Sequence, residues 1–275
     1  MMAVAAAPCG RVPVLLKVLF VSTGSRPPAQ IPVREEFHAN LARSVRLLRA
    51  FRAEQDDTAA YYALLAEDTV RQLGQYTDLK GRLVLDIGGG PGFFVQALRS
   101  AGARAFCVDS DAGELAGAGG PEPGSVLGSA LDIPVGSRRV DVSLSSNVLE
   151  HVPDPERMLA EMIRVTRPGG TVYCAFTNWL SPWGGHETSP WHYLGGERAA
   201  RGYQRRYGSP PKNLYGAGLF PVSVARALRW ARTRTDAELV DAVPRYLPGW
   251  TRPLLRLPGA REVLTWNLLM VLRRH

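Results

Sequence analysis

Apolar side chains recur at every third or fourth position between residues 34 and 73, which is the spacing of one face of an α-helix. The pattern stops over Gln55–Thr58, where polar residues gather. It therefore predicts two amphipathic helices ahead of the rest of the fold.

Four short apolar runs follow at similar intervals, and they cover residues 83–88, 105–110, 140–146 and 170–177. Short continuous apolar runs are typical of parallel strands that are buried on both faces. Helical spacing lies between them at residues 93–101 and 155–166, the second segment beginning behind the capping residue Asp154. This alternation of strand and helix predicts a doubly wound α/β sheet.

The pattern changes over residues 178–221, which are rich in Trp, Tyr, Gly, Pro and His. We expect an insertion over the edge of the sheet there, with one helix at residues 196–207. Further elements are expected to complete the sheet: a helix over residues 221–233, a strand around 239–243 and a final strand over 263–272.

At the start of the chain, an apolar run from Val12 to Val21 is interrupted by Pro13 and Lys17. It is shorter than the ~20 residues of a membrane-spanning helix, so residues 1–33 are predicted to be a flexible extension. Residues 34–275 then form one domain with four parts: a helical segment (34–80), a ligand-binding half (81–177), the insertion (178–221) and a C-terminal helix with strands (222–275).

Composition narrows the functional class. The chain has 275 residues, of which 45% are hydrophobic and 21% charged, as expected of a soluble globular protein. Its three cysteines, Cys9, Cys107 and Cys174, form no CxxC pair, which favours a reducing, cytoplasmic location over a disulfide framework.

The net charge of +8 is concentrated at the C-terminal end, because residues 176–275 hold 15 Lys and Arg against 6 Asp and Glu. An anionic substrate, a nucleic acid or peripheral contact with an acidic membrane is compatible with this excess.

The chemistry of the chain centres on the segment after the first predicted strand. The strand ends near Asp86, and glycines at 88, 89, 90 and 92 precede the next helix. Glycine allows a sharp turn and a close approach of the backbone to a ligand at the N-terminus of a helix. A dinucleotide fingerprint, GxGxxG, requires a third glycine where this chain has Phe93, so that ligand class is disfavoured.

With these motifs the sequence resembles the class I S-adenosylmethionine-dependent methyltransferases, of the group that includes small-molecule, quinone and sterol methyltransferases. The resemblance spans residues 83–177 and rests on VLDIGGGPG, VDSD, ALDIPV, VDVSLSSNVLEHV and RVTRPGGTVY in that order. The flanking segments, such as WGGHE and HYLGG, look like an actinobacterial-type subgroup. The resemblance implies a Rossmann-like, seven-stranded, mostly parallel sheet whose last strand is antiparallel, with residues 34–80 as a lid.

The resemblance also implies residues that hold the methyl donor, S-adenosyl-L-methionine, whose product is S-adenosyl-L-homocysteine. Asp86 would lie near the methionine ammonium, and Asp109 would accept hydrogen bonds from both ribose hydroxyls. Ser129 stands where relatives often carry an acid that binds adenine. The other matching positions are Gly88, Gly89, Gly90, Gly92, Ser110, Ala130, Ser146 and Asn147.

Four residues are candidates for catalysis: His151, His186, Glu187 and His192. An imidazole with an ordinary pKa of about 6.5 can act as a general base near neutral pH. The alternatives are a structural hydrogen bond for His151 and bracing of the insertion for the other three. A metal site is not expected, since an HExxH helix is absent from the sequence.

The sequence therefore predicts a methyltransferase that acts on a small or lipid-like acceptor, at oxygen. An RNA methyltransferase is an alternative, although Ser145–Val148 does not match the NPPY-type tetrad of enzymes that methylate base amines. A module that binds the donor without catalysis is a third possibility.

Overall fold

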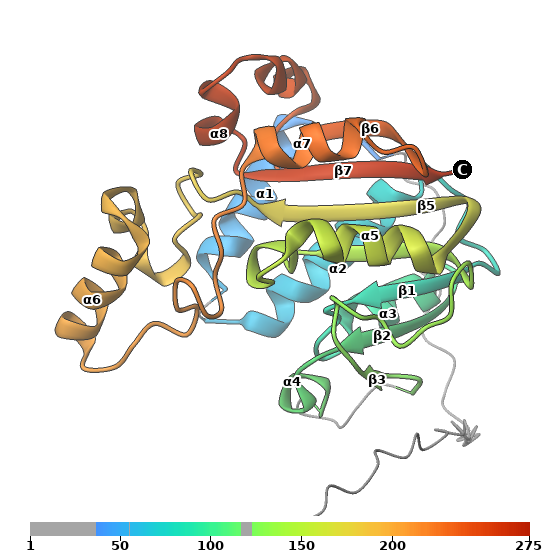
Figure 1. Ribbon diagram of the computed structural model, residues 1–275, viewed down its shortest axis with the longest axis horizontal. Helices are drawn as coiled ribbons and strands as arrows, with labels where there is room; N and C mark the ends of the chain where they lie inside the picture. Colours follow the sequence, from blue (N-terminus) through green and yellow to red (C-terminus); the bar gives the residue numbers. More distant parts are fainter. Residues whose placement is uncertain (1–36, 55, 117–122) are drawn as a thin grey trace, which may run out of the picture.

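The computed structural model describes residues 37–54, 56–116 and 123–275, so the predicted flexible extension lies outside the described residues. Seven strands form one sheet in the order β3-β2-β1-β4-β5-β7-β6 (Figure 1). The strands are β1 (Leu83–Ile87), β2 (Arg104–Asp109), β3 (Val126–Leu127), β4 (Val140–Ser146), β5 (Thr166–Thr177), β6 (Ala237–Pro244) and β7 (Asn267–Arg274).

The direction of the strands matches the expected sheet. β1 pairs in parallel with β2 and β4, and the pairs β2–β3 and β4–β5 are also parallel. β7 runs antiparallel to both of its neighbours, β5 and β6. The predicted seven-stranded, mostly parallel α/β sheet with an antiparallel last strand is confirmed.

Helices cover both faces of this sheet (Figure 1). Leu85 and Ile87 of β1 pack with α5 and α7 on one face, and Val84 packs with α2 and α3 on the other. The side chains of a strand alternate between faces, so every central strand contributes to two cores. The helices are α1 (Leu41–Arg52), α2 (Thr58–Leu73), α3 (Phe93–Ser100), α4 (Ala112–Ala116), α5 (Pro155–Val165), α6 (Gly196–Tyr207), α7 (Val224–Arg232) and α8 (Ala260–Leu264).

The sequence patterns predicted the ends of most of these elements to within a few residues. The predicted pair of N-terminal helices is present as α1 and α2, with its break between Arg52 and Thr58. Asp154 caps α5 by accepting a hydrogen bond from the backbone N–H of Arg157 at 3.0 Å. The predicted helix at 196–207 is α6.

Two strand predictions were wrong at their ends. The final strand begins at Asn267, and Val263 and Leu264 belong to α8. The Glu262 carboxylate of α8 accepts hydrogen bonds from the first two backbone N–H groups of α7, which holds this segment away from the sheet. β5 begins at Thr166 instead of Gly170, because the chain pairs with β4 through a bulge before the regular register starts.

The insertion between β5 and α7 lies beyond the carboxyl ends of the parallel strands, with α6 farthest from the sheet (Figure 1). It also contains two short 3₁₀ helices, η2 (His186–Thr188) and η3 (Trp191–Leu194). Two more lie outside it, η1 (Leu149–His151) after β4 and η4 (Gly249–Arg256) after β6. The insertion therefore stands over the edge where open α/β sheets bind ligands.

A buried ion pair ties the N-terminal helices to the sheet. Arg43 of α1 donates to both carboxylate oxygens of Asp68 on α2, at 2.8 and 2.6 Å. The same guanidinium donates to the backbone carbonyl of Arg245, just after β6. None of the helices within the described ranges is long and apolar enough to cross a membrane.

We predict that Asp68→Ala destabilises the fold by about 3–5 kcal/mol, because it leaves the buried Arg43 guanidinium without its carboxylate. The matched control is Glu67→Ala on the same helix, whose ion pair with Arg71 is partly exposed and is expected to contribute less than ~1 kcal/mol. Urea unfolding of the two variants measures the difference, and equal free energies of unfolding would contradict the assignment.

Candidate active site

The glycine turn between β1 and α3 is shaped by a shortage of space. Gly88, Gly90 and Gly92 all have positive φ, at 76°, 48° and 91°. A Cβ added at Gly88 would lie 2.3 Å from a methyl carbon of Val148, which follows β4. A Cβ added at Gly90 would meet no atom within 4 Å among the described residues. The turn is thus packed on its Gly88 side and open at Gly90.

Asp109 at the end of β2 is held against this turn. One carboxylate oxygen accepts a hydrogen bond from the Gly90 N–H at 3.0 Å, and the other accepts from the Asp111 N–H at 2.9 Å. Ser110, the next residue, is exposed. The structure therefore brings Asp109 and the glycine turn together, although they lie on different strands.

Asp86 lies beneath the turn, fully buried, and its Oδ2 has no hydrogen-bond partner among the described residues. A Cβ added at Gly89 would approach that oxygen to 2.6 Å, so Gly89 leaves room for the carboxylate. Burial, together with the smaller effect of the negative charge of Asp109, raises the pKa of Asp86 to about 8. The site therefore holds an acidic group that a bound cation would favour in its ionised form.

The loop after β3 adjoins the same edge, since the Gly128 N–H donates to the Asp109 carbonyl. Ser129 is exposed, and its hydroxyl accepts a hydrogen bond from the Leu131 N–H within its own turn. Ala130 is half-buried and packs against the core. The side chain of Ser129 is thus engaged locally, whereas the backbone here lies beside Asp109.

The end of β4 forms the other side of the site. The Ser146 hydroxyl accepts a hydrogen bond from the buried Arg245 at 2.8 Å. Asn147 has a φ of 59°, and its side-chain amide bonds to Tyr246 and Asn267. These internal contacts leave the backbone at Ser146 and Asn147 as the part that could face a ligand.

The four candidate catalytic residues fall into two groups. The rings of His151 and His186 lie 4.9 Å apart, centroid to centroid. Glu187 is exposed and accepts a hydrogen bond from Asn213. His192 is buried against Trp179 and bonds to the Ser181 carbonyl. The structure brings the first two together and places the other two elsewhere in the insertion.

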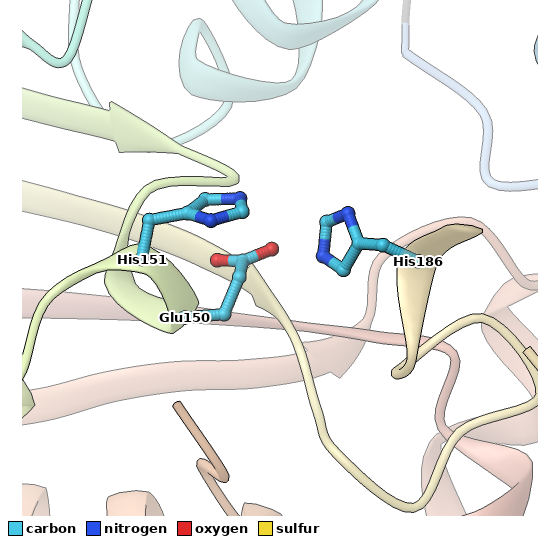
Figure 2. A group of neighbouring side chains, drawn as sticks. All are labelled: Glu150, His151 and His186. Carbon is cyan, nitrogen blue, oxygen red and sulfur yellow. The ribbon is translucent and has the colours of Figure 1, made fainter. Parts of the chain in front are cut away.

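The sequence reasoning missed Glu150, which joins His151 and His186. It is only 1% exposed, and its Oε1 accepts a hydrogen bond from the Thr177 N–H at 2.9 Å. Figure 2 shows both imidazole rings facing its carboxylate. Burial lowers the pKa of His186 to about 4, so its ring is neutral near pH 7. The sequence signal that was available for Glu150 is its position next to His151 in the motif LEHV.

A run of aromatic side chains connects the insertion to the glycine turn. The ring centroids of Trp183 and Phe51 of α1 lie 5.1 Å apart, and those of Phe51 and Tyr61 of α2 lie 6.0 Å apart. The run continues through Tyr62, whose ring stacks on Phe93 at the start of α3. The N-terminal helices and the insertion thus form one apolar wall beside the turn.

Comparison with known proteins shows that the chain is similar to methyltransferases. A family model described as a methyltransferase domain matches residues 85–174. The chain is 47% identical over 248 residues to an uncharacterized methyltransferase of Mycobacteroides abscessus, covering 86% of this chain and 95% of that protein.

Solved structures with lower identity share the fold. The S-adenosylmethionine-dependent methyltransferase of Mesorhizobium loti is 19% identical with a TM-score of 0.53, covering 76% of this chain and 98% of that chain. A structure of the complex between the Haloferax volcanii Trm112 methyltransferase activator and a putative methyltransferase gives 19% identity and a TM-score of 0.51, with 88% and 99% covered.

The raised pKa of Asp86 predicts a pH dependence of stability. Between about pH 4 and pH 8 the folded chain keeps a proton on Asp86 that the unfolded chain has lost, since the ordinary pKa is 3.8. Raising the pH across this window therefore lowers the free energy of unfolding, by up to about 1.4 kcal/mol per pH unit. Urea unfolding at several pH values measures the slope.

Asp86→Asn is the control, because the amide keeps the shape of the side chain and does not titrate. We expect the contribution of Asp86 to vanish in this variant, so that its stability falls less between pH 4 and pH 8. Parallel pH profiles for the two chains would show that the Asp86 carboxyl ionises normally.

Proposed function

This chain belongs to the family of S-adenosylmethionine-dependent methyltransferases, and we propose that it methylates an oxygen atom of a small or lipid-like molecule. S-adenosylmethionine is the methyl donor and supplies an electrophilic methyl group on a sulfonium. We propose the class of the acceptor and the kind of atom that is methylated. The small-molecule, quinone or sterol grouping and the actinobacterial-type subgroup stay predictions.

The residues at the carboxyl edge of the sheet fit the donor. The Asp86 carboxylate oxygen that has no partner within the described ranges provides an acceptor for an ammonium group, and the open face at Gly90 leaves space beside the turn. We assign the ribose hydroxyls to Asp109, because one carboxylate offers acceptors to both members of a vicinal diol. Ser129, Ala130, Ser146 and Asn147 would then border the donor through backbone atoms.

The observation that carries the acceptor proposal is the group of Glu150, His151 and His186, the first two of which closely follow Val148 at the glycine turn. Val148, which packs on Gly88, is three residues from His151, and its carbonyl accepts the His151 N–H. A hydroxyl acceptor must lose its proton as the new O–C bond forms and the S–C bond breaks. Two imidazoles and a carboxylate in this position would assist that loss, which supports the proposal.

The aromatic wall supports a small or lipid-like acceptor over a polymer. Phe51, Tyr61, Tyr62 and Trp183 present large apolar faces between the N-terminal helices and the insertion. Such faces bind rings or acyl chains and exclude water from the reacting atoms. We infer that α1 and α2 act with the insertion as the cover of the acceptor site.

We predict that Asp109→Asn weakens the binding of S-adenosylhomocysteine at least ~10²-fold, because it removes the charge from two hydrogen bonds to the ribose. Isothermal titration calorimetry measures the affinity. Asp111→Asn is the matched control, since its exposed carboxylate bonds to Gly113 two residues away, and it should stay within about threefold of wild type. Equal affinities for all three chains would refute the ribose assignment.

Transfer of a labelled methyl group tests the acceptor class. We expect label in phenolic or aliphatic hydroxyl compounds at least ~10-fold faster than in amines with the same carbon skeleton, because the site is arranged to deprotonate an oxygen. Label in total RNA instead would favour an RNA methyltransferase. Tight donor binding with transfer to none of these acceptors would favour a module without catalysis.

A further inference from the structure

Three potential metal ligands lie close together, two from the segment after β4 and one from the insertion. Glu150 and His151 belong to η1, and His186 begins η2, 35 positions later in the chain. One ligand atom from each side chain lies within 4.8 Å of the other two. Figure 2 shows the carboxylate between the two imidazole rings, which approach it from opposite sides.

Each of the three side chains offers an atom that can bind a metal ion. Glu150 Oε2 and His186 Nε2 are buried and have no hydrogen-bond partner among the described residues. His151 Nδ1 lies 2.7 Å from the Gly218 carbonyl, to which it must donate because a carbonyl only accepts. With the proton on Nδ1, the nitrogen that can bind a metal is Nε2, and a carbonyl that orients a histidine in this way is typical of metal ligands.

The backbone holds these groups in place at a cost. His186 has a φ of 48°, in the left-handed region that disfavours a side chain with a Cβ. The Glu150 carbonyl accepts the Phe220 N–H, while its side chain accepts the Thr177 N–H. Segments on both sides of the insertion thus fix the carboxylate, and a strained residue presents the second imidazole to it.

The ligand set selects the kind of ion. One carboxylate and two imidazoles form a common catalytic zinc set and the set of non-haem iron sites, whereas Mg²⁺ and Ca²⁺ prefer oxygen ligands. Bonds of ~2.0–2.2 Å place the ligands of a tetrahedral ion about 3.4 Å apart. Because one ligand atom from each of the three side chains lies within 4.8 Å of the other two, these atoms need to approach by little more than an ångström.

We propose that Glu150, His151 and His186 bind one divalent transition-metal ion of the zinc type, and that its open coordination position takes the oxygen of the methyl acceptor. The second half of this inference rests on the proposed function, and the ion site itself does not. An ion held there lowers the pKa of a bound hydroxyl, whose proton then passes to solvent water. The oxygen takes the methyl group, and the donor's sulfur keeps the electron pair of the broken S–C bond, which leaves a neutral thioether.

The ion site is tested on the full chain, without a polyhistidine tag, after dialysis against a chelator. We expect the stripped chain to bind one equivalent of Zn²⁺ by calorimetry with a dissociation constant below ~10 μM, and one Co²⁺ with a visible absorption band. Failure to bind either ion at that affinity overturns the proposal.

Two variants locate the ion. Glu150→Gln keeps the acceptor for the Thr177 N–H, and His186→Gly relieves the positive φ, so each is expected to fold. Each should bind Zn²⁺ at least ~100-fold more weakly. Glu197→Gln, an exposed position on α6 with the same change of charge, should bind like wild type. Unchanged binding in the first two variants overturns the assignment of these ligands.

A third measurement separates this inference from the donor site. S-adenosylhomocysteine should bind equally well to the stripped chain, the metal-loaded chain and both ligand variants, because the ion contacts the acceptor side. Loss of methyl transfer on stripping, restored by Zn²⁺, supports the role of the ion. Full transfer by the stripped chain overturns that role, whereas failure of S-adenosylhomocysteine to bind any of these chains would count against the proposed function instead.

Discussion

The absence of a side chain at Gly88 is the constraint on which the site depends. Val148 occupies the volume that a Cβ at Gly88 would need, so the turn after β1 and the end of β4 can lie in contact. The same turn presents the Gly90 N–H to Asp109 on β2. Three strands of a parallel sheet thus meet at one point of its carboxyl edge, which is where such sheets bind ligands.

Several buried polar groups at the carboxyl edge of the sheet differ from the ion pair that joins the N-terminal helices. Between α1, α2 and the sheet, Asp68 and Arg43 satisfy one another through two hydrogen bonds. At the carboxyl edge, Asp86, Glu150 and His186 each keep a buried atom without a partner among the described residues. An unsatisfied buried polar group costs about 1–3 kcal/mol, so this edge gives up stability that the rest of the fold supplies. Such a concentration is typical of a ligand site.

The insertion and the N-terminal helices pack together beside the carboxyl edge of the sheet. Trp183 packs on Phe51 of α1, and Tyr62 of α2 stacks on Phe93 at the beginning of α3. The insertion also delivers His186 to Glu150 and His151, through a backbone conformation that is unfavourable in isolation. The sheet therefore builds the proposed donor side of the site, and segments outside the sheet build the proposed acceptor side.

Features that depend on neighbours in the chain could be predicted from the sequence. The spacing of Gly88, Gly90 and Gly92 indicated the turn, Asp154 with Pro155 indicated the start of α5, and alternating apolar segments indicated the doubly wound sheet. Two elements could not be predicted correctly from their own residues. β3 has only two residues, too few for a pattern, and the apolar letters at Val263 and Leu264 could not reveal that Glu262 binds the N-terminus of α7.

The side chains of the proposed acceptor side were brought together by tertiary structure alone. His186 and Glu187 are neighbours in sequence, yet one faces Glu150 and the other bonds to Asn213 in solvent. The motif LEHV does not show what Glu150 contacts, because those contacts depend on Thr177, Phe220 and His186 folding around it. Short-range spacing records backbone geometry, whereas the meeting of side chains from distant segments depends on how those segments pack, and packing is a property of the whole fold.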